Sequence, residues 1–193
     1  MIGEVDKRKD YQEFSFMNNK IDKYIETYLG KKFHFLDPDP DDIDMEDIAH
    51  SLSMQCRYTG HSKYFYSIAE HSMIVADLCD EENALWGLLH DASEAYLTDL
   101  ASPIKQFLPE YKKMEKVLMD AIATKFGLEL TMPEDVHICD RMALLVEAKE
   151  LMFSAGEGWL VNDGTIHVPE IKLDLYDPTT AKKKFLETFE ELK

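Results

Sequence analysis

Residues 84–96 read ALWGLLHDASEAY, and this stretch decides the fold. Its first half is apolar apart from one glycine, which is typical of a helix buried at the centre of a domain. Its second half places His90, Asp91 and Glu94 in the same helix, which we expect to span residues 83–96. Burying an unpaired carboxylate costs several kcal/mol, so a buried acid here needs a cation, a hydrogen-bond network or a shifted pKa.

Helical periodicity extends on both sides of this stretch. Apolar residues recur every three to four positions, which predicts further helices. One or two short strands are predicted only near residues 165–175, where Pro169 weakens the pattern. The fold class is therefore all-α, with six to eight helices and at most this minor strand pair. We expect the other helices at residues 14–29, 45–57, 63–79, 110–126, 133–152 and 178–193, with a short helical turn at Pro103.

Length and charge limit the classes of protein. The chain has 193 residues, about the length of one domain, and we divide it into an arm at 1–42 with one helix and a domain at 43–193. It carries 38 acidic and 21 basic residues, for a net charge of −17. Such a surface repels phosphate backbones and anionic membranes. We therefore expect neither a nucleic-acid polymer nor a membrane as partner, while a homo-oligomer is compatible with the sequence.

Three cysteines, Cys56, Cys79 and Cys139, occur in spacings that match no metal or disulfide motif. Their odd number indicates reduced thiols, each packed as a small core residue. The first residues lack the apolar stretch of a signal peptide, and no apolar run approaches the ~18 residues of a membrane span. We expect a cytoplasmic protein.

Four polar residues occupy positions where the helical pattern favours apolar ones: His71, His90, Asp91 and Asp140. Two imidazoles and two carboxylates that converge from three helices can share one divalent ion. This mixed nitrogen and oxygen set suits Mn, Fe, Co, Ni or Zn, with Mg also open, and leaves room for water. Adjacent residues of a helix point about 100° apart, so His90 and Asp91 can reach one ion only near a distortion or from a gap between helices.

The order His71, then His90 and Asp91, then Asp140 resembles the H…HD…D signature of the HD-domain metal-dependent phosphohydrolases. The blocks IAEHS, LLHDASEAYLTDLASPIK, LPEYKKMEK and CDRMALLVEAKEL are similar to the branch that contains bacterial 5′-deoxynucleotidases and phage dATP triphosphohydrolases. This similarity covers residues 43–152. It implies an HD-domain helical bundle in which the four residues bind the catalytic metal.

The resemblance also implies roles for two acids. Glu94 would position water or relay protons, and Asp99 would help to hold the substrate. Glu94 lies one helical turn after His90, so its carboxylate is expected in the same pocket. An exposed charge at a helix end is the other interpretation of Glu94.

The segment DIAHSLSMQCRYTGHSKYFYSIAEHS resembles the substrate side of the same branch. Arg57 is the best candidate to bind phosphate, because a guanidinium contacts two oxygens at once. Tyr58 can stack on a base, His61 can contact a phosphate or a sugar hydroxyl, and Lys105 and Lys116 are further phosphate candidates. Each also has a structural interpretation: the arginine as a helix end, the tyrosine as core, the histidine as a loop residue and the lysines as solvated charges.

We expect a hydrolase that cleaves a phosphate ester of a free deoxynucleotide. The long block before His71 favours a dNTP triphosphohydrolase that releases nucleoside and triphosphate. A 5′-deoxynucleotidase acting on dNMPs is the first alternative, and a nucleotide-binding regulatory domain without turnover is the second. The sequence contains no GxSxG elbow, no GxxxxGKS/T phosphate loop and no GxGxxG turn. No motif therefore indicates a serine hydrolase, a P-loop protein or a Rossmann-type dinucleotide-binding protein.

Overall fold

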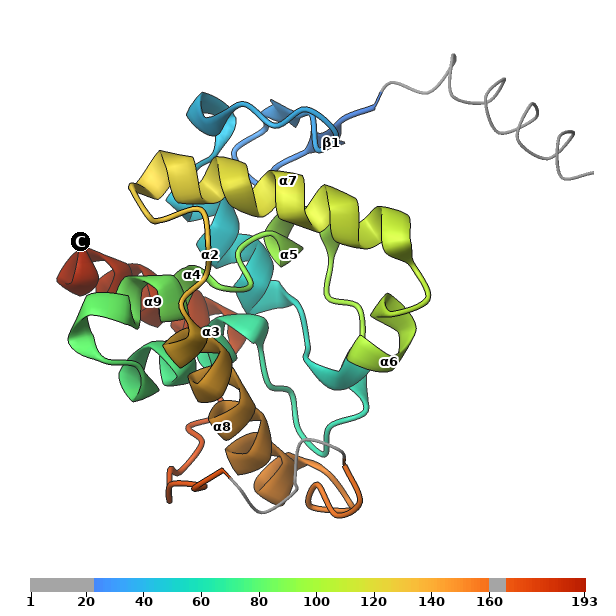
Figure 1. Ribbon diagram of the computed structural model, residues 1–193, viewed down its shortest axis with the longest axis vertical. Helices are drawn as coiled ribbons and strands as arrows, with labels where there is room; N and C mark the ends of the chain where they lie inside the picture. The colour runs from blue at the N-terminus through green and yellow to red at the C-terminus, as the bar shows by residue number, and fades with distance from the viewer. Residues whose placement is uncertain (1–22, 160–165) are drawn as a thin grey trace, which may run out of the picture.

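The computed structural model describes residues 23–159 and 166–193, and most of their regular structure is helical (Figure 1). This confirms the predicted all-α class. No helix in these two ranges is long and apolar enough to cross a membrane. The α-helices are α2 (Met45–Met54), α3 (Ile68–Leu78), α4 (Ala84–Leu89), α5 (Glu94–Leu97), α6 (Ser102–Lys105), α7 (Pro109–Phe126), α8 (Glu134–Leu151) and α9 (Pro178–Leu192), and short 3₁₀ helices lie at Pro40–Asp42, Tyr58–Gly60 and Glu81–Asn83.

A small hairpin precedes the helices. Strands β1 (Ile25–Glu26) and β2 (Lys32–Phe33) are antiparallel and form the sheet of the described chain. Gly30 turns the chain between them with a φ of +76°, a conformation that glycine adopts without strain.

The hairpin replaces part of a predicted helix. The helix expected at residues 14–29 is wrong over residues 23–29, and its earlier part lies outside the described residues. Tertiary packing explains the difference, because Phe33 is fully buried and stacks on Tyr96 with 4.0 Å between ring centroids. Together with the hydrogen bond from the backbone N–H of Leu29 to Asp47 Oδ1 at 2.8 Å, this contact holds the hairpin against the helices.

The segment before the last helix is fastened to α3 and forms no strand. The Glu70 carboxylate accepts hydrogen bonds from the backbone N–H groups of Asp174, Leu175 and Tyr176, at 3.1, 2.8 and 2.9 Å. These donors are not available to a neighbouring strand. The strand pair predicted near 165–175 is therefore wrong in position, since described residues 166–175 contain no strand.

Two helices are shorter than predicted on either side of Arg57. Helix α2 ends at Met54 rather than at residue 57, and α3 begins at Ile68 rather than at residue 63. The chain between them folds back on itself through the 3₁₀ helix Tyr58–Gly60, and the backbone N–H of Arg57 donates to the carbonyl of Tyr66 at 2.9 Å. Arg57 is therefore held in a segment between two helices and not at the end of one.

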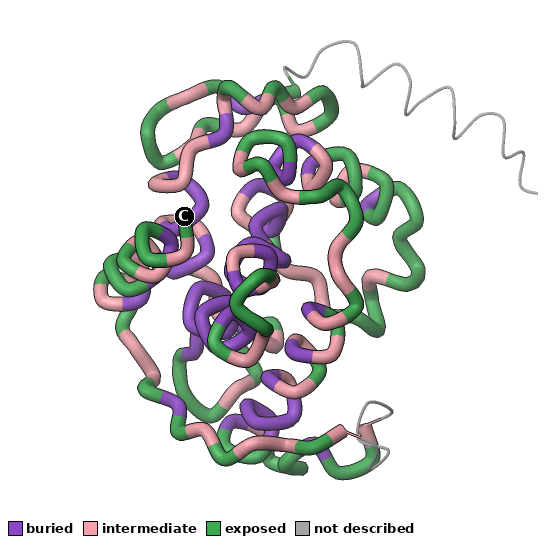
Figure 2. The backbone as a smooth tube through the Cα atoms, turned by 60° about the vertical axis from the view of Figure 1, so that its left-hand side comes forward, coloured by how far each residue is buried: buried purple, intermediate pink, exposed green. Residues whose placement is uncertain are grey.

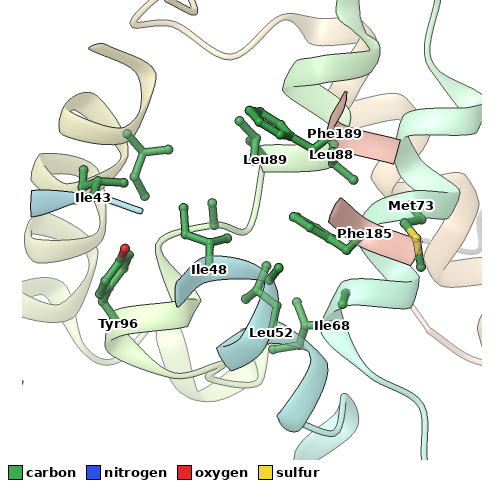
Figure 3. Packing of buried hydrophobic residues seen from close by; sticks show 14 of the residues in the cluster. Ile43, Ile48, Leu52, Ile68, Met73, Leu88, Leu89, Tyr96, Phe185 and Phe189 are labelled. Atoms are coloured by element: carbon green, nitrogen blue, oxygen red, sulfur yellow. The ribbon is translucent and has the colours of Figure 1, made fainter. Parts of the chain in front are cut away.

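The main core lies around α3, which packs against α2, α4, α8 and α9. Buried residues concentrate in the middle of the molecule (Figure 2), and Figure 3 shows Leu52, Leu88 and Phe185 packed there. Helix α7 crosses the upper part of the view in Figure 1, and α8 runs down its lower half. Because α3 carries His71 and α8 carries Asp140, core packing fixes the distance between these two side chains.

Candidate metal centre

The helix predicted at residues 83–96 breaks at the polar residues. Helix α4 ends at Leu89 and α5 begins at Glu94. Ala92 N–H donates to the carbonyl of Leu89, and Glu94 N–H to that of Asp91, each at 3.0 Å, which is the tight bonding of 3₁₀ geometry. The break turns adjacent side chains toward one point, as the sequence requires. His90 Nε2 lies 3.2 Å from Asp91 Oδ2.

The four predicted metal ligands converge from α3, the α4–α5 break and α8. His71 Nε2 lies 3.2 Å from His90 Nε2 and 3.2 Å from Asp140 Oδ1. Asp91 Oδ2 lies 3.7 Å from His71 Nε2, and His90 Nε2 lies 3.8 Å from Asp140 Oδ1. The structure thus brings together residues that are as far as 69 positions apart in the sequence, by the difference 140 − 71.

The hydrogen bonds of the two imidazoles fix their tautomers. His71 Nδ1 donates to Glu147 Oε1 at 2.6 Å, and His90 Nδ1 donates to the carbonyl of Gly87 at 2.7 Å. A carboxylate and a carbonyl only accept, so each Nδ1 carries the hydrogen. Both Nε2 atoms then present lone pairs to the same space, which is the arrangement found in metal-binding histidines.

The donor set fits a divalent cation. Metal–nitrogen and metal–oxygen bonds of about 2.0–2.2 Å place neighbouring ligand atoms about 3–3.5 Å apart. Most of the measured separations lie at or slightly above this range. Lone pairs and carboxylate oxygens repel one another at these distances, so either a second proton on an imidazole or a bound cation must lie between them. His71, His90 and Asp140 offer ligand atoms within 4.8 Å of one another and can hold a metal ion. Asp91 Oδ2 lies beside the two imidazoles, at 3.2 and 3.7 Å, and is a further candidate ligand.

The charges of the centre reinforce one another. Burial alone would lower the pKa of His90, but the carboxylates of Asp91 and Asp140 outweigh it and raise the pKa to about 9. Burial would raise the pKa of Asp140, but the contact with His71, in its protonated form, and the nearby His90 lower it to about 2. The carboxyl of Asp91 has a pKa far below its ordinary value, because His90, His71 and Arg57 outweigh burial. The centre thus holds strong negative charge that attracts cations.

One side of the centre is open to solvent. The side chain of His71 is fully buried and that of His90 is 4% exposed, whereas those of Asp91 and Asp140 are 23% and 40% exposed. The imidazoles form the floor and the carboxylates form the rim. Water or a small substrate can therefore approach from the carboxylate side.

Glu147 organises the centre, and the sequence reasoning did not identify it. Its carboxylate is fully buried and accepts hydrogen bonds from His71 Nδ1 and Arg57 Nε, at 2.6 and 3.1 Å. The hydroxyls of Tyr58 and Tyr66 donate to it at 2.6 and 3.1 Å. Burial would raise the pKa of Glu147, but Arg57 and His71 lower it to about 2.

A spacing signal for Glu147 was present in the sequence. It follows Asp140 by seven positions, which is two turns of α8, so both side chains lie on the same face of that helix. An acid two turns from a metal ligand, among the apolar residues Val146 and Ala148, is a candidate to orient another ligand.

Arg57 and Tyr58 lie beside the centre, bound to Glu147. Arg57 Nη1 also lies 3.6 Å from Asp91 Oδ2. The guanidinium is almost fully buried, and the acids around it raise its pKa despite burial. Tyr58 and Thr59 have φ values of 57° and 55°, which are left-handed and strained for residues with a β-carbon. Such a backbone conformation persists only where other contacts maintain it. Here the hydrogen bond from the Tyr58 hydroxyl to Glu147 does so.

Glu94 is buried at the start of α5, which excludes its interpretation as an exposed helix end. Lys105 Nζ donates to Glu94 Oε1 at 3.3 Å and to Glu115 Oε1 at 2.6 Å. Asp99 is half-buried after a turn in which its backbone N–H donates to Gln55 Oε1 at 3.1 Å. Burial raises the pKa of Asp99, with Arg57 opposing that shift.

The remaining substrate candidates lie at the surface. The side chain of His61 is exposed at the end of the Tyr58–Gly60 helix. Lys116 is 72% exposed and forms an ion pair with Asp120 at 2.8 Å, one turn along α7. Neither makes a contact with the four converging side chains in the described part of the chain.

Comparison with known proteins identifies relatives. No protein-family model matches the chain. YfdR of Escherichia coli (strain K12), described as an uncharacterized protein, is 37% identical over 169 residues, covering 88% of this chain and 95% of YfdR. An uncharacterized protein of Rhodobacter capsulatus is 35% identical over 130 residues, covering 62% of this chain and 66% of that protein. The chain belongs to the protein family of Escherichia coli YfdR.

Proposed function

We propose that this protein is a metal-dependent phosphohydrolase of free deoxynucleotides. The observation that carries the proposal is the pair of imidazole Nε2 atoms, 3.2 Å apart, that face two carboxylates. The resemblance to HD-domain phosphohydrolases implies that these two histidines and two aspartates bind one metal ion. His71, His90, Asp91 and Asp140 would hold the ion, which when bound would polarise a phosphoryl oxygen and lower the pKa of water.

Glu94 is suited to hold and move a proton beside this ligand set. Its Oε1 accepts from Lys105, whereas its buried Oε2 has no hydrogen-bond partner among the described residues. Burial, together with the nearby Asp91 and Asp99, raises the pKa of this carboxyl well above its ordinary value. A carboxyl that keeps its proton near neutral pH can donate it to a leaving oxygen, and its carboxylate can take one from the attacking water.

Two cationic side chains beside the candidate ligands could bind a phosphate. Arg57 borders Asp91, and Lys105 borders Glu94. The planar guanidinium can contact two phosphate oxygens in a fixed geometry, while the ammonium acts as a point charge. Their side chains are largely buried, with exposed fractions of 11% and 20%, so a phosphate would meet them only at the edge of the centre.

The sequence resemblance and the charge balance favour different substrates, a triphosphate and a monophosphate. The long block before His71 favours a dNTP, with hydrolysis at the α-phosphorus to give nucleoside and triphosphate. The charge balance favours the alternative, a 5′-deoxynucleotidase, because Arg57 and Lys105 each already have two carboxylate partners. A monophosphate needs less compensating positive charge than a triphosphate.

A substrate survey tests the proposal. The protein is loaded in turn with Mn, Co, Fe, Ni, Zn and Mg and incubated with each dNMP and each dNTP, and the products are separated by chromatography. Triphosphate with nucleoside identifies a triphosphohydrolase, and inorganic phosphate from a dNMP identifies a nucleotidase. Absence of turnover with every metal would contradict the proposal. Nucleotide binding without turnover would favour a regulatory domain.

A matched pair of histidine variants links turnover to the centre. His90→Ala should lose bound metal, measured by elemental analysis, together with activity. His137→Ala is the control, because His137 is an exposed histidine on α8. Equal metal content in the two variants would exclude His90 as a ligand.

A further inference from the structure

A second group of metal-binding side chains lies outside the centre described above. The Sγ atoms of Cys79 and Cys139 and a carboxylate oxygen of Asp135 lie within 4.8 Å of one another. Cys79 caps the C-terminal end of α3, whereas Asp135 and Cys139 are one turn apart on α8. Cys139 is buried and Cys79 is partly exposed, so an ion could enter from the side of Cys79.

The carboxylate of Asp135 is held in place by groups outside this cluster. Its Oδ2 accepts from the backbone N–H of Asp80 at 3.2 Å and from Asn83 Nδ2 at 3.3 Å. Its Oδ1 lies 3.8 Å from Cys139 Sγ. One oxygen is thus oriented by hydrogen bonds while the other faces the thiols. Such outer hydrogen bonds position a carboxylate that ligates a metal.

The packing of α3 against α4 leaves room for the Cys79 thiol. A β-carbon added to Gly87 would lie 2.9 Å from Cys79 Sγ and 3.0 Å from the α-carbon of Ala76. Only glycine therefore allows this thiol to occupy its position. The carbonyl of the same Gly87 accepts from His90, so one residue borders both the thiol cluster and the His/Asp centre.

We propose that Cys79, Cys139 and Asp135 form a second cation site, which takes a thiophilic divalent ion such as Zn²⁺. Two thiolates and one carboxylate are ligands that zinc accepts, with water in the fourth position. Zinc–sulfur bonds of about 2.3 Å and zinc–oxygen bonds of about 2.1 Å place tetrahedral ligands about 3.5–4 Å apart, which matches the Cys139–Asp135 separation. Binding releases the two thiol protons to solvent.

The site would join the two helices that carry the His/Asp centre. Cys79 lies on α3 eight positions after His71, and Cys139 immediately precedes Asp140 on α8. A cation bound here would fix the end of α3 to α8. It would stabilise the arrangement of these helices without contacting a substrate, and it does not depend on the proposed phosphohydrolase activity.

Cobalt absorption tests this site separately from the His/Asp centre. The full chain is kept reduced with a phosphine and titrated with Co²⁺, and the spectrum is recorded. Thiolate ligation produces sulfur-to-cobalt charge-transfer absorption in the near ultraviolet, which imidazole and carboxylate ligands do not produce. We expect this absorption from the wild-type protein and from His90→Ala, and its displacement by Zn²⁺.

Cysteine variants provide the matched controls. Cys79→Ser and Cys139→Ser should each lose most of the near-ultraviolet absorption, and Asp135→Asn should weaken Co²⁺ binding. Cys56→Ser should behave as the wild type, because Cys56 lies elsewhere and contacts Ser62. Circular dichroism checks that each variant is folded, and Cys139→Ala replaces the serine variant if it is not. No charge-transfer absorption from the reduced wild type, or its retention in both cysteine variants, would overturn the proposal.

Discussion

Glu147 and Glu94 are both buried beside the same centre, yet their pKa values shift in opposite directions. Glu147 accepts four hydrogen bonds, including those from Arg57 and His71, and these groups outweigh burial and lower its pKa to about 2. Glu94 accepts from Lys105 on one oxygen, and burial raises its pKa well above the ordinary value.

The difference shows that donors decide the charge of a buried carboxyl as much as burial does. A carboxylate with a full set of donors is a fixed negative charge that orients its neighbours. A carboxyl with a buried oxygen that lacks a donor favours its neutral form and is free to exchange a proton. Glu147 is therefore a positioning residue, and Glu94 is the candidate for proton transfer.

Removing Glu147 should have the largest effect on the folded protein. Glu147→Ala leaves the buried guanidinium of Arg57 without its main partner, which we expect to lower the free energy of unfolding by about 3–5 kcal/mol. It also frees the ring of His71, so metal affinity should fall by about 10- to 100-fold. Denaturant unfolding and metal titration measure the two effects. Glu150→Ala, an exposed change on the same helix, is the control, and equal stability of both variants would contradict this role.

Replacing the carboxyl of Glu94 by an amide should reduce turnover in a protein that still folds. Glu94→Gln keeps the shape of the side chain but cannot exchange a proton, so we expect kcat to fall by about 10²- to 10⁴-fold. Metal content should be unchanged. Glu115→Gln is the matched control, because Glu115 shares Lys105 with Glu94. Similar kcat values for the two variants would remove Glu94 from the mechanism.

The two carboxyls should give opposite pH dependences of stability in chelator-treated protein. Glu147 binds protons more weakly when folded, so its contribution is present above its ordinary pKa of 4.5 and is lost as pH falls toward about 2. Glu94 binds them more tightly when folded, so its contribution is present below 4.5 and is lost as pH rises through the raised pKa.

Urea unfolding at a series of pH values measures this contrast. The stability of Glu94→Gln relative to the wild type should increase as pH rises above 4.5, because the variant has no carboxyl to ionise. The deficit of Glu147→Gln should shrink as pH falls from 4.5 toward 2. Parallel stability curves for the wild type and both variants would contradict the assigned pKa directions.

The smallest effect is expected from one donor to Glu147. Tyr66→Phe removes a single hydroxyl that donates to Oε1 at 3.1 Å, while three other donors remain. We expect a loss of about 1.5 kcal/mol in the free energy of unfolding. Tyr64→Phe is the control, since Tyr64 is exposed. If Tyr66→Phe lowered the free energy of unfolding as much as Glu147→Ala does, the stabilisation of the carboxylate would not be distributed over its four donors.

The four converging residues were predictable because each interrupts an apolar helical pattern with a polar side chain. The sequence also indicated that His90 and Asp91 cannot both face one ion on a regular helix, which left a distortion or a gap between helices open; the uninterrupted helix predicted at 83–96 was wrong at this point. These inferences need only local spacing. They explain why the helices that carry the centre were largely placed correctly.

Contacts between distant segments could not be predicted in this way. Arg57 and Tyr58 meet Glu147 from 90 and 89 positions away, so the carboxylate that fixes both appeared as an ordinary helix charge. The hairpin depends in the same way on Phe33 meeting Tyr96, 63 positions later by the difference 96 − 33. The pairing of two cysteines with Asp135 likewise exists only once α3 and α8 are packed.

Glu70 and His71 are neighbours on α3 but face different parts of the protein. His71 faces the candidate metal centre, and Glu70 accepts hydrogen bonds from the backbone of residues 174–176. If the chain ended before residue 174, the buried carboxylate of Glu70 would lose its three backbone donors. This residue directly precedes His71. The segment before α9 and a candidate metal ligand are thus attached to neighbouring positions of α3, so loss of that segment would remove support beside His71.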